Sequence, residues 1–180
     1  MSVVIVIPAY QPGALLIETL EGLAASGYPV VVVNDGSAEE CHTIFSRAAA
    51  IPNVEVIEHA VNLGKGAALR AGMNHALCRY RRAQGVVTAD ADGQHRVADI
   101  LAVARDLEGA NTELVLGVRQ FPKDVPLRSR IGNSLTRTLF RALYGQDLRD
   151  TQTGLRGVPR PWLRPCSGHA TPATSSNSTC

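Results

Sequence analysis

Short apolar runs recur along residues 1–120, and each is followed by a polar or glycine-containing turn and then a helical stretch. Nearly continuous apolar runs are typical of strands buried on both faces of a parallel sheet. Strands that alternate with helices predict an α/β domain with a mostly parallel central sheet, whose ligands bind beyond the carboxyl ends of the strands. The predicted strands are 3–7, 30–33, 54–57, 85–89 and 113–117, and the predicted helices lie near 13–26, 38–50, 65–83 and 96–108.

The pattern changes toward the end of the sequence. A helix is predicted at 127–144, where leucine or isoleucine recurs every four residues and arginines lie largely off this apolar stripe. The helix either packs its stripe against the core or presents a basic face to an anionic acceptor or a membrane surface. From residue 165 onward, small polar residues without periodicity predict disorder. We therefore expect one domain at 1–164 and a disordered tail at 165–180.

The composition fits a single domain with a sizeable core, since 45% of the 180 residues are hydrophobic and 19% are charged. A net charge of +2 and an aromatic content of 4% argue against a nucleic-acid partner. No apolar run approaches the ~18–20 residues that span a bilayer, and the first residues do not resemble a signal peptide. Four cysteines without CxxC spacing indicate reduced thiols. These features predict a cytoplasmic protein.

The strongest local motif is Asp-Ala-Asp-Gly-Gln-His at 90–95, directly after the fourth predicted strand. Asp90 and Asp92 are separated by one residue, and two such carboxylates at the mouth of a sheet can converge on one divalent cation. Gln94 adds a neutral oxygen. The alternative is an acidic turn that caps the helix beginning near Arg96. The position after a buried strand favours a site for Mg²⁺ or Mn²⁺.

Two further polar turns follow predicted strands. Asp35 lies in Asn-Asp-Gly-Ser at 34–37, where it can accept hydrogen bonds from a base or ribose, although a strand-to-helix turn explains these residues on its own. Lys65 lies in Asn-Leu-Gly-Lys-Gly at 62–66, where glycines, a cation and a helix N-terminus suit an anion. This turn matches neither the P-loop nor the dinucleotide-binding pattern. Each turn is weak evidence when taken alone.

Arginines follow the fifth predicted strand, and their guanidinium groups suit phosphates. A single surface arginine is more often a solvated charge. The turn Asp-Thr-Gln-Thr-Gly-Leu-Arg at 150–156 adds Thr153 and Arg156 to this region. The arginines in question are Arg119, Arg128 and Arg130.

The motifs are more specific in combination than singly. Pro-Ala-Tyr at 8–10, the turns that hold Asp35 and Lys65, the acidic motif at 90–95 and the turn at 150–156 follow one another in this order. The series closely resembles the inverting family-2 glycosyltransferases of GT-A fold, in the branch that contains dolichol-phosphate mannose synthase and polyprenyl-phosphate glycosyltransferases. The resemblance covers roughly residues 2–164.

The resemblance implies a role for each matching position. The residues implied to hold the donor nucleotide are Pro8, Ala9, Tyr10, Asp35, Lys65 and Asp90. The implied ligands of a Mg²⁺ or Mn²⁺ ion that bridges the donor diphosphate are Asp90, Asp92 and Gln94. The implied catalytic residues are Asp92, Arg119 and Arg130, and those implied on the acceptor side are Arg128, Arg130, Thr153 and Arg156.

The implied reaction moves a sugar from a UDP- or GDP-linked donor to an acceptor, with inversion. A lipid phosphate is already an anion at neutral pH and can attack without a general base, which fits a sequence in which we can nominate no base. A glycan hydroxyl would need one. An acceptor lipid and the basic helix would bring the chain into peripheral contact with the inner face of the membrane, although no segment anchors it there.

The family-like pattern stops near Leu163, where a Ser/Thr-rich tail begins. We interpret the end of the chain as truncated or frame-shifted, since a neighbouring reading frame can encode a segment that resembles the relatives. Two alternatives follow. The chain binds a nucleotide sugar without turnover, or it is a phosphatase of the haloacid-dehalogenase type, whose signature also begins Asp-x-Asp-Gly. The second alternative fits less well, because that signature follows the first strand.

Overall fold

The computed structural model describes residues 3–109, 114–117 and 154–163. The predicted helix at 127–144 and the predicted tail at 165–180 lie outside these ranges. The strands are β1 (Val4–Ala9), β2 (Val30–Asp35), β3 (Val54–His59), β4 (Gly85–Thr88), β5 (Val115–Leu116) and β6 (Arg156–Pro159). The helices are α1 (Leu15–Ala24), the 3₁₀ turn η1 (Glu39–Cys41), α2 (His42–Ala49), α3 (Lys65–Arg79), α4 (Val97–Gly109) and α6 (Arg160–Leu163).

The strands form one sheet in the order β3-β2-β1-β4-β6-β5. The first four strands in this order are parallel to one another, and β6 runs antiparallel to both β4 and β5. The predicted α/β fold with a mostly parallel sheet is therefore confirmed. Five predicted strands and four predicted helices are present with ends shifted by a few residues, and the predicted strand at 113–117 is reduced to Val115–Leu116.

The sequence did not predict β6, because we interpreted Arg156 as part of a turn. Arg-Gly-Val-Pro has low β propensity, since glycine weakens a strand and proline removes a hydrogen-bond donor. The segment is a strand because it pairs with β4 from Gly85 to Thr88. This pairing brings the beginning of β6 to the carboxyl end of β4, where the predicted acidic motif begins.

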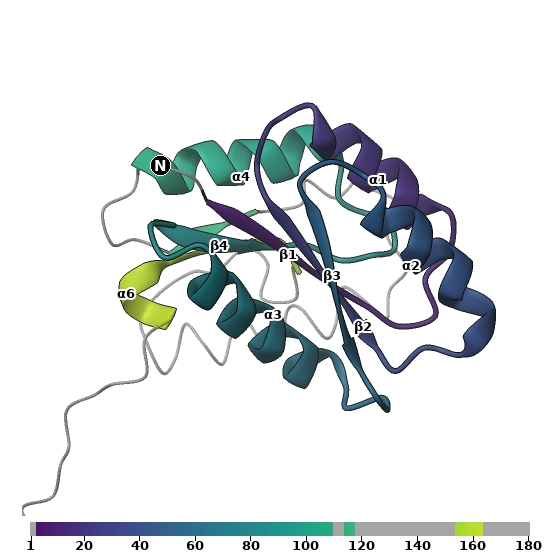
Figure 1. The fold of residues 1–180 in the computed structure, drawn as a ribbon. Helices are drawn as coiled ribbons and strands as arrows, with labels where there is room; N and C mark the ends of the chain where they lie inside the picture. Colours follow the sequence, from purple (N-terminus) through teal and green to yellow (C-terminus); the bar gives the residue numbers. More distant parts are fainter. Residues whose placement is uncertain (1–2, 110–113, 118–153, 164–180) are drawn as a thin grey trace, which may run out of the picture.

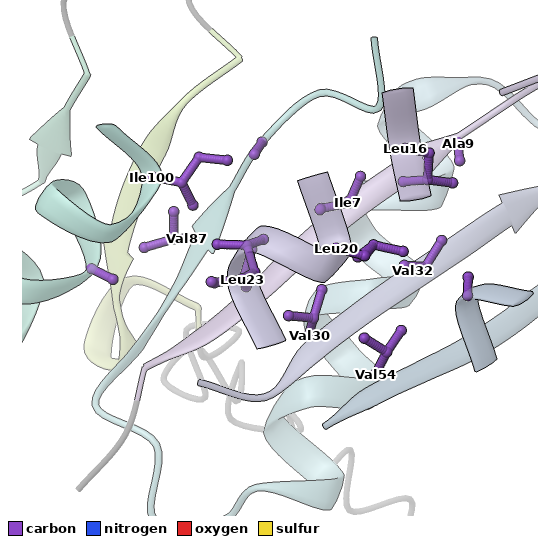
Figure 2. Packing of buried hydrophobic residues seen from close by; sticks show 14 of the residues in the cluster. Ile7, Ala9, Leu16, Leu20, Leu23, Val30, Val32, Val54, Val87 and Ile100 are labelled. Atoms are coloured by element: carbon purple, nitrogen blue, oxygen red, sulfur yellow. The ribbon is translucent and has the colours of Figure 1, made fainter. Parts of the chain in front are cut away.

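Helices cover both faces of the sheet, with α1, α2 and α4 on one face and α3 on the other (Figure 1). Alternate side chains of β1 belong to different clusters: Ile5 and Ile7 pack with Leu16 and Leu20 of α1, whereas Val6 packs with small residues of α3. Figure 2 shows the larger cluster, to which Val32, Val87 and Ile100 also belong. Because β1 is buried on both faces, the almost uninterrupted apolar run of its sequence is explained.

Gly36, directly after β2, has a left-handed backbone with φ of +66°, and a Cβ there would overlap the backbone of Val61 and Asn62. We expect Gly36→Ala to lower the free energy of unfolding, measured by urea denaturation. Gly27→Ala is the matched control, because Gly27 has φ of +75° but open space around it. The control should cost about 1–2 kcal/mol for the backbone alone, and Gly36→Ala about 1–3 kcal/mol more. Equal losses of unfolding free energy in the two variants would show that Gly36 does not lie against the backbone of Val61 and Asn62.

Candidate functional site

A cavity of about 470 Å³ lies beyond the carboxyl ends of β1, β2 and β4 and beside the beginning of α3. Its walls come from the turns after four different strands, which lie far apart in the sequence. This is the edge at which ligands of parallel sheets bind. The lining residues are Pro8, Ala9, Tyr10, Gln11, Pro12, Gly13, Asp35, Asn62, Gly64, Lys65, Asp90, Ala91 and Asp92.

Asp90 lies between two basic side chains of the site. Lys65 Nζ lies 2.6 Å from Asp90 Oδ1, and His95 Nε2 lies 3.6 Å from Oδ2. The neighbouring His95 lowers the pKa of Asp90 most, burial opposes ionisation, and Lys65 lowers the pKa further. The net result is a pKa well below the ordinary value of an aspartate. Asp90 is therefore ionised at neutral pH and available as a hard oxygen donor.

Gly154 brings the chain that precedes β6 against this carboxylate. A Cβ at this position would overlap the Asp90 side chain, so a larger residue would displace the carboxylate. The hydroxyl of Thr88 donates a hydrogen bond of 2.8 Å to the Gly154 carbonyl, which holds the two segments together. Gly154, which belongs to the turn expected on the acceptor side, thus lies directly beside Asp90 of the acidic motif.

Asp92 is exposed at the cavity mouth, and its Oδ1 accepts a hydrogen bond of 2.9 Å from the backbone N–H of Gln94. Gly93 between them has φ of +71°, which makes the sharp turn possible. Gln94 is also exposed, but the lining residues of the cavity do not include it. The structure therefore brings Asp90 and Asp92 together in one wall and leaves Gln94 outside it.

Asp35 forms the floor of the cavity at the end of β2 and is 2% exposed. His59 Nδ1 lies 2.7 Å from its Oδ1, and the backbone N–H of Leu63 donates to the same oxygen at 3.0 Å. Burial raises the pKa of Asp35 and is the largest single influence. The hydrogen bonds from His59 and from the N–H groups of Leu63 and Gly64 outweigh it and hold the pKa below its ordinary value.

The lowered pKa values of Asp35 and Asp90 predict that acid destabilises the folded protein. A carboxyl whose pKa is lower in the folded state adds stability above its unfolded pKa, near 4, and this contribution is lost as the pH falls through the folded pKa. We expect the free energy of unfolding to fall between pH 5 and about pH 2, and to fall less in Asp35→Asn. Denaturant titrations at several pH values would measure both. Replacing exposed Asp106 of α4 in the same way should leave the wild-type slope, and an identical slope in Asp35→Asn would contradict the prediction.

Gln11 and Cys41, which the sequence did not single out, help to hold the loop after β1 in place. The backbone N–H of Gln11 donates to Ser37 Oγ at 3.0 Å, and the Cys41 thiol donates to Gln11 Oε1 at 3.1 Å. Gln11 has φ of +50°, an uncommon value for a residue other than glycine. The position of this loop after a buried strand was the available signal. Its contacts with the loop after β2 depend on the parallel pairing of β1 and β2.

Several predicted residues cannot be placed in the cavity. Arg119, Arg128, Arg130 and Thr153 lie outside the described residues. Arg156 opens β6 opposite Thr88, at the same edge of the sheet as the cavity, and is exposed. The roles implied for these residues remain predictions.

The donor set of the cavity fits a hard divalent cation that keeps open positions. Within the described ranges, no three His, Cys, Asp or Glu side chains are arranged to hold a metal ion by themselves. Asp90 and Asp92 nevertheless offer carboxylate oxygens on neighbouring positions of one wall. Mg²⁺ is commonly bound by one or two carboxylates together with phosphate oxygens and water, and Mn²⁺ favours similar ligands.

The described residues form an α/β domain with a cavity at the carboxyl ends of its parallel strands, lined by carboxylates and a lysine. The family model described as "Glycosyl transferase family 2" matches residues 4–164. The chain therefore belongs to glycosyl transferase family 2, and the predicted family is confirmed. The phosphatase interpretation is wrong, because the acidic motif follows the fourth strand of a family-2 domain.

Relatives with assigned names include lipid-phosphate sugar transferases. The chain is 32% identical to an uncharacterized protein of Methanocaldococcus jannaschii, over 86% of this chain and 63% of that protein. It is 29% identical to a dolichyl-phosphate beta-glucosyltransferase of Trichomonas vaginalis (84% and 51%). It is 28% identical to a UDP-N-acetylglucosamine–dolichyl-phosphate N-acetylglucosaminyltransferase of Methanococcus voltae (89% and 70%). The chain thus spans between about half and seven tenths of the length of these relatives.

The crystal structure of S. aureus TarS 1-349 has a similar fold. It matches with a TM-score of 0.52 and 20% sequence identity, over 68% of this chain and 39% of TarS 1-349. In the ranges that the structure describes, no helix combines the length and hydrophobicity needed to cross a bilayer.

Proposed function

We propose that the protein is a glycosyltransferase that moves a sugar from a UDP- or GDP-linked donor to a polyprenyl or dolichyl phosphate, with inversion and the help of a divalent cation. The observation that carries the proposal is the convergence of Asp35, Lys65, Asp90 and Asp92 on one cavity in a chain of glycosyl transferase family 2. The names of its relatives from T. vaginalis and M. voltae support a lipid-phosphate acceptor.

We assign the nucleoside and the diphosphate of the donor to different residues of the cavity. Asp35 is a buried, ionised acceptor suited to the N–H and O–H groups of a nucleoside, with Pro8, Ala9 and Tyr10 beside it. Lys65 stands at the N-terminus of α3, where its ammonium and the helix dipole both favour the diphosphate. A cavity of about 470 Å³ lies within the usual size range of small-molecule sites. Lys65 and the beginning of α3 are thus the part of the cavity suited to phosphates, and Asp35 is the part suited to a nucleoside.

Asp90 and Asp92 are the residues that would hold Mg²⁺ or Mn²⁺, with Gln94 as a further candidate. When bound, such a cation neutralises charge that develops on the leaving diphosphate. Lys65 can stabilise the same charge from the protein side, because its ammonium belongs to the same cavity and lies 2.6 Å from the Asp90 carboxylate.

The nature of the acceptor follows from the chemistry of its attack on the donor sugar. A lipid phosphate attacks as an anion, so the cavity needs no general base. We assign Arg128, Arg130, Thr153 and Arg156 to the acceptor side, and Arg119 and Arg130 to catalysis near the diphosphate. A lipid acceptor requires the protein to work at a membrane surface, and we expect peripheral contact from the cytoplasmic side.

A transfer assay tests this proposal. The protein is incubated with UDP- and GDP-sugars labelled in the sugar, with Mn²⁺, and with either a short polyprenyl phosphate or the corresponding polyprenol. We expect label in the lipid phosphate only, because the alcohol needs a base to attack. Label in the polyprenol would contradict the phosphate acceptor. Donor binding without transfer to either lipid would show that this chain binds the nucleotide sugar without turnover.

A further inference from the structure

Asp35 and His59 are the last residues of two adjacent parallel strands. The register of β2 and β3 pairs Asp35 with His59 directly, so the sheet itself sets one beside the other. The backbone between these strands is hydrogen-bonded along six successive pairs. The contact between the two side chains is therefore built into the most regular part of the fold.

The geometry of the contact fixes one oxygen of Asp35. His59 Nδ1 and the Leu63 N–H both meet Oδ1, at 2.7 Å and 3.0 Å, and neither of these bonds involves Oδ2. The side chains are 3% exposed for Asp35 and 14% exposed for His59. An ionised carboxylate only accepts hydrogen bonds, so Nδ1 of His59 must carry the proton. Because these two hydrogen bonds hold Oδ1, the carboxylate group does not rotate freely about the Cβ–Cγ bond of Asp35.

We propose that His59 is a positioning residue for nucleotide recognition, which holds Asp35 so that its second oxygen is presented to N–H or O–H groups of the nucleoside. This inference rests on the proposed function, in which Asp35 meets the nucleoside of the donor. A carboxylate left free to rotate would lose conformational entropy on binding and would also accept other partners. His59 removes that freedom before the ligand arrives, without lining the cavity itself.

A merely structural role for His59 would be to anchor the loop between β3 and α3. That loop keeps a second bond to the end of β2, because the Leu63 N–H also donates to Asp35, and a bond of 2.9 Å from the Gly64 N–H to Asn62 Oδ1 supports the shape of the loop from within. Loss of a loop anchor would weaken the binding of every part of the donor, since Asn62, Gly64 and Lys65 line the cavity as well. Loss of a positioning residue should weaken the binding of the nucleoside alone.

The experiment compares the affinities of UDP, GDP and inorganic pyrophosphate, each with Mn²⁺, by isothermal titration calorimetry. His59→Phe keeps a planar ring without a donor, and His59→Asn keeps an N–H donor near the position of Nδ1. The matched control is His75→Phe, because His75 lies 2.8 Å from a carboxylate of Glu55 on another part of the sheet, away from the cavity. A double variant with Asp35→Asn tests whether His59 acts through Asp35.

We expect His59→Phe to lower the affinity for the preferred nucleotide by about tenfold or more, the size of a lost hydrogen bond to a charged group. Pyrophosphate should bind as in the wild type, His59→Asn should restore most of the affinity, and His59→Phe should cause little further loss once Asp35→Asn is present. Wild-type affinity in His59→Phe, or equal losses for nucleotide and pyrophosphate, would overturn the inference alone. A wild-type protein that binds neither nucleotide would overturn the proposed function and this inference with it.

Discussion

Replacing Asp92 with asparagine is expected to abolish cation-dependent binding of the nucleotide sugar and to leave the fold intact. Asp92 is exposed at the cavity mouth, and its Oδ1 accepts one bond from a backbone N–H, which an asparagine oxygen can also accept. The turn should therefore persist, whereas one of the two carboxylates that this wall offers to a cation is lost. We expect transfer to fall by about a hundredfold to a thousandfold, the size found when one electrostatic contact to developing charge is removed.

Calorimetric titration of donor with and without Mn²⁺ measures the binding, and thermal unfolding checks the fold. Asp106→Asn is the matched control, because Asp106 is an exposed carboxylate of α4 that does not line the cavity. The control should bind as the wild type does. An Asp92→Asn protein with unchanged Mn²⁺-dependent affinity would remove Asp92 from the metal site and leave the acidic motif with the turn-forming role that the sequence also allowed.

Lys65→Met is expected to change two affinities in opposite directions. Lys65 lies 2.6 Å from Asp90, so its ammonium competes with any cation for that carboxylate in the absence of donor. Without Lys65, Mn²⁺ alone should bind more tightly. The donor should bind about tenfold more weakly or worse, because a charged hydrogen bond to the diphosphate is missing. In the wild type, the diphosphate would give Lys65 a new partner and release Asp90 for the cation.

Electron paramagnetic resonance of Mn²⁺ and calorimetry of the donor would separate the two effects. Arg70→Met removes one positive charge from an exposed position of the same helix and should alter neither affinity by more than a small factor. If Lys65→Met binds Mn²⁺ no more tightly than the wild type and still loses donor affinity, the competition for Asp90 is absent. If both affinities stay unchanged, Lys65 takes no part in the site.

The sequence predicted where the cavity lies, because the apolar runs were enough to predict the strands. Once β1, β2, β3 and β4 are parallel neighbours, the turns that follow them must meet at one edge. Asp35, Lys65, Asp90 and Asp92 lie at the ends of three of these strands or in the turns that follow them, and they line one cavity as a result. This prediction needed no separate evidence that the turns contact one another.

The partners of these residues could not be predicted in the same way. The bond between Asp35 and His59 depends on the register of β2 and β3, which the apolar pattern alone leaves open by two residues in either direction. The approach of Gly154 to Asp90 depends on β6, a strand that owes its existence to pairing with β4 rather than to its own residues. Register and long-range pairing therefore account for most of what the sequence missed among the described residues.

The central claim is that the cavity binds a nucleotide sugar together with a divalent cation, and a thermal-shift measurement on the unmodified protein tests it directly. UDP- and GDP-sugars are each compared in Mn²⁺, Mg²⁺ and EDTA. A donor at 100 times its Kd should stabilise the fold by ~2.7 kcal/mol, which raises Tm by several degrees for a domain of this size. We expect a rise with one of the two nucleotides and only in the presence of a cation. No rise with any donor, or a rise of the same size in EDTA, would contradict the account.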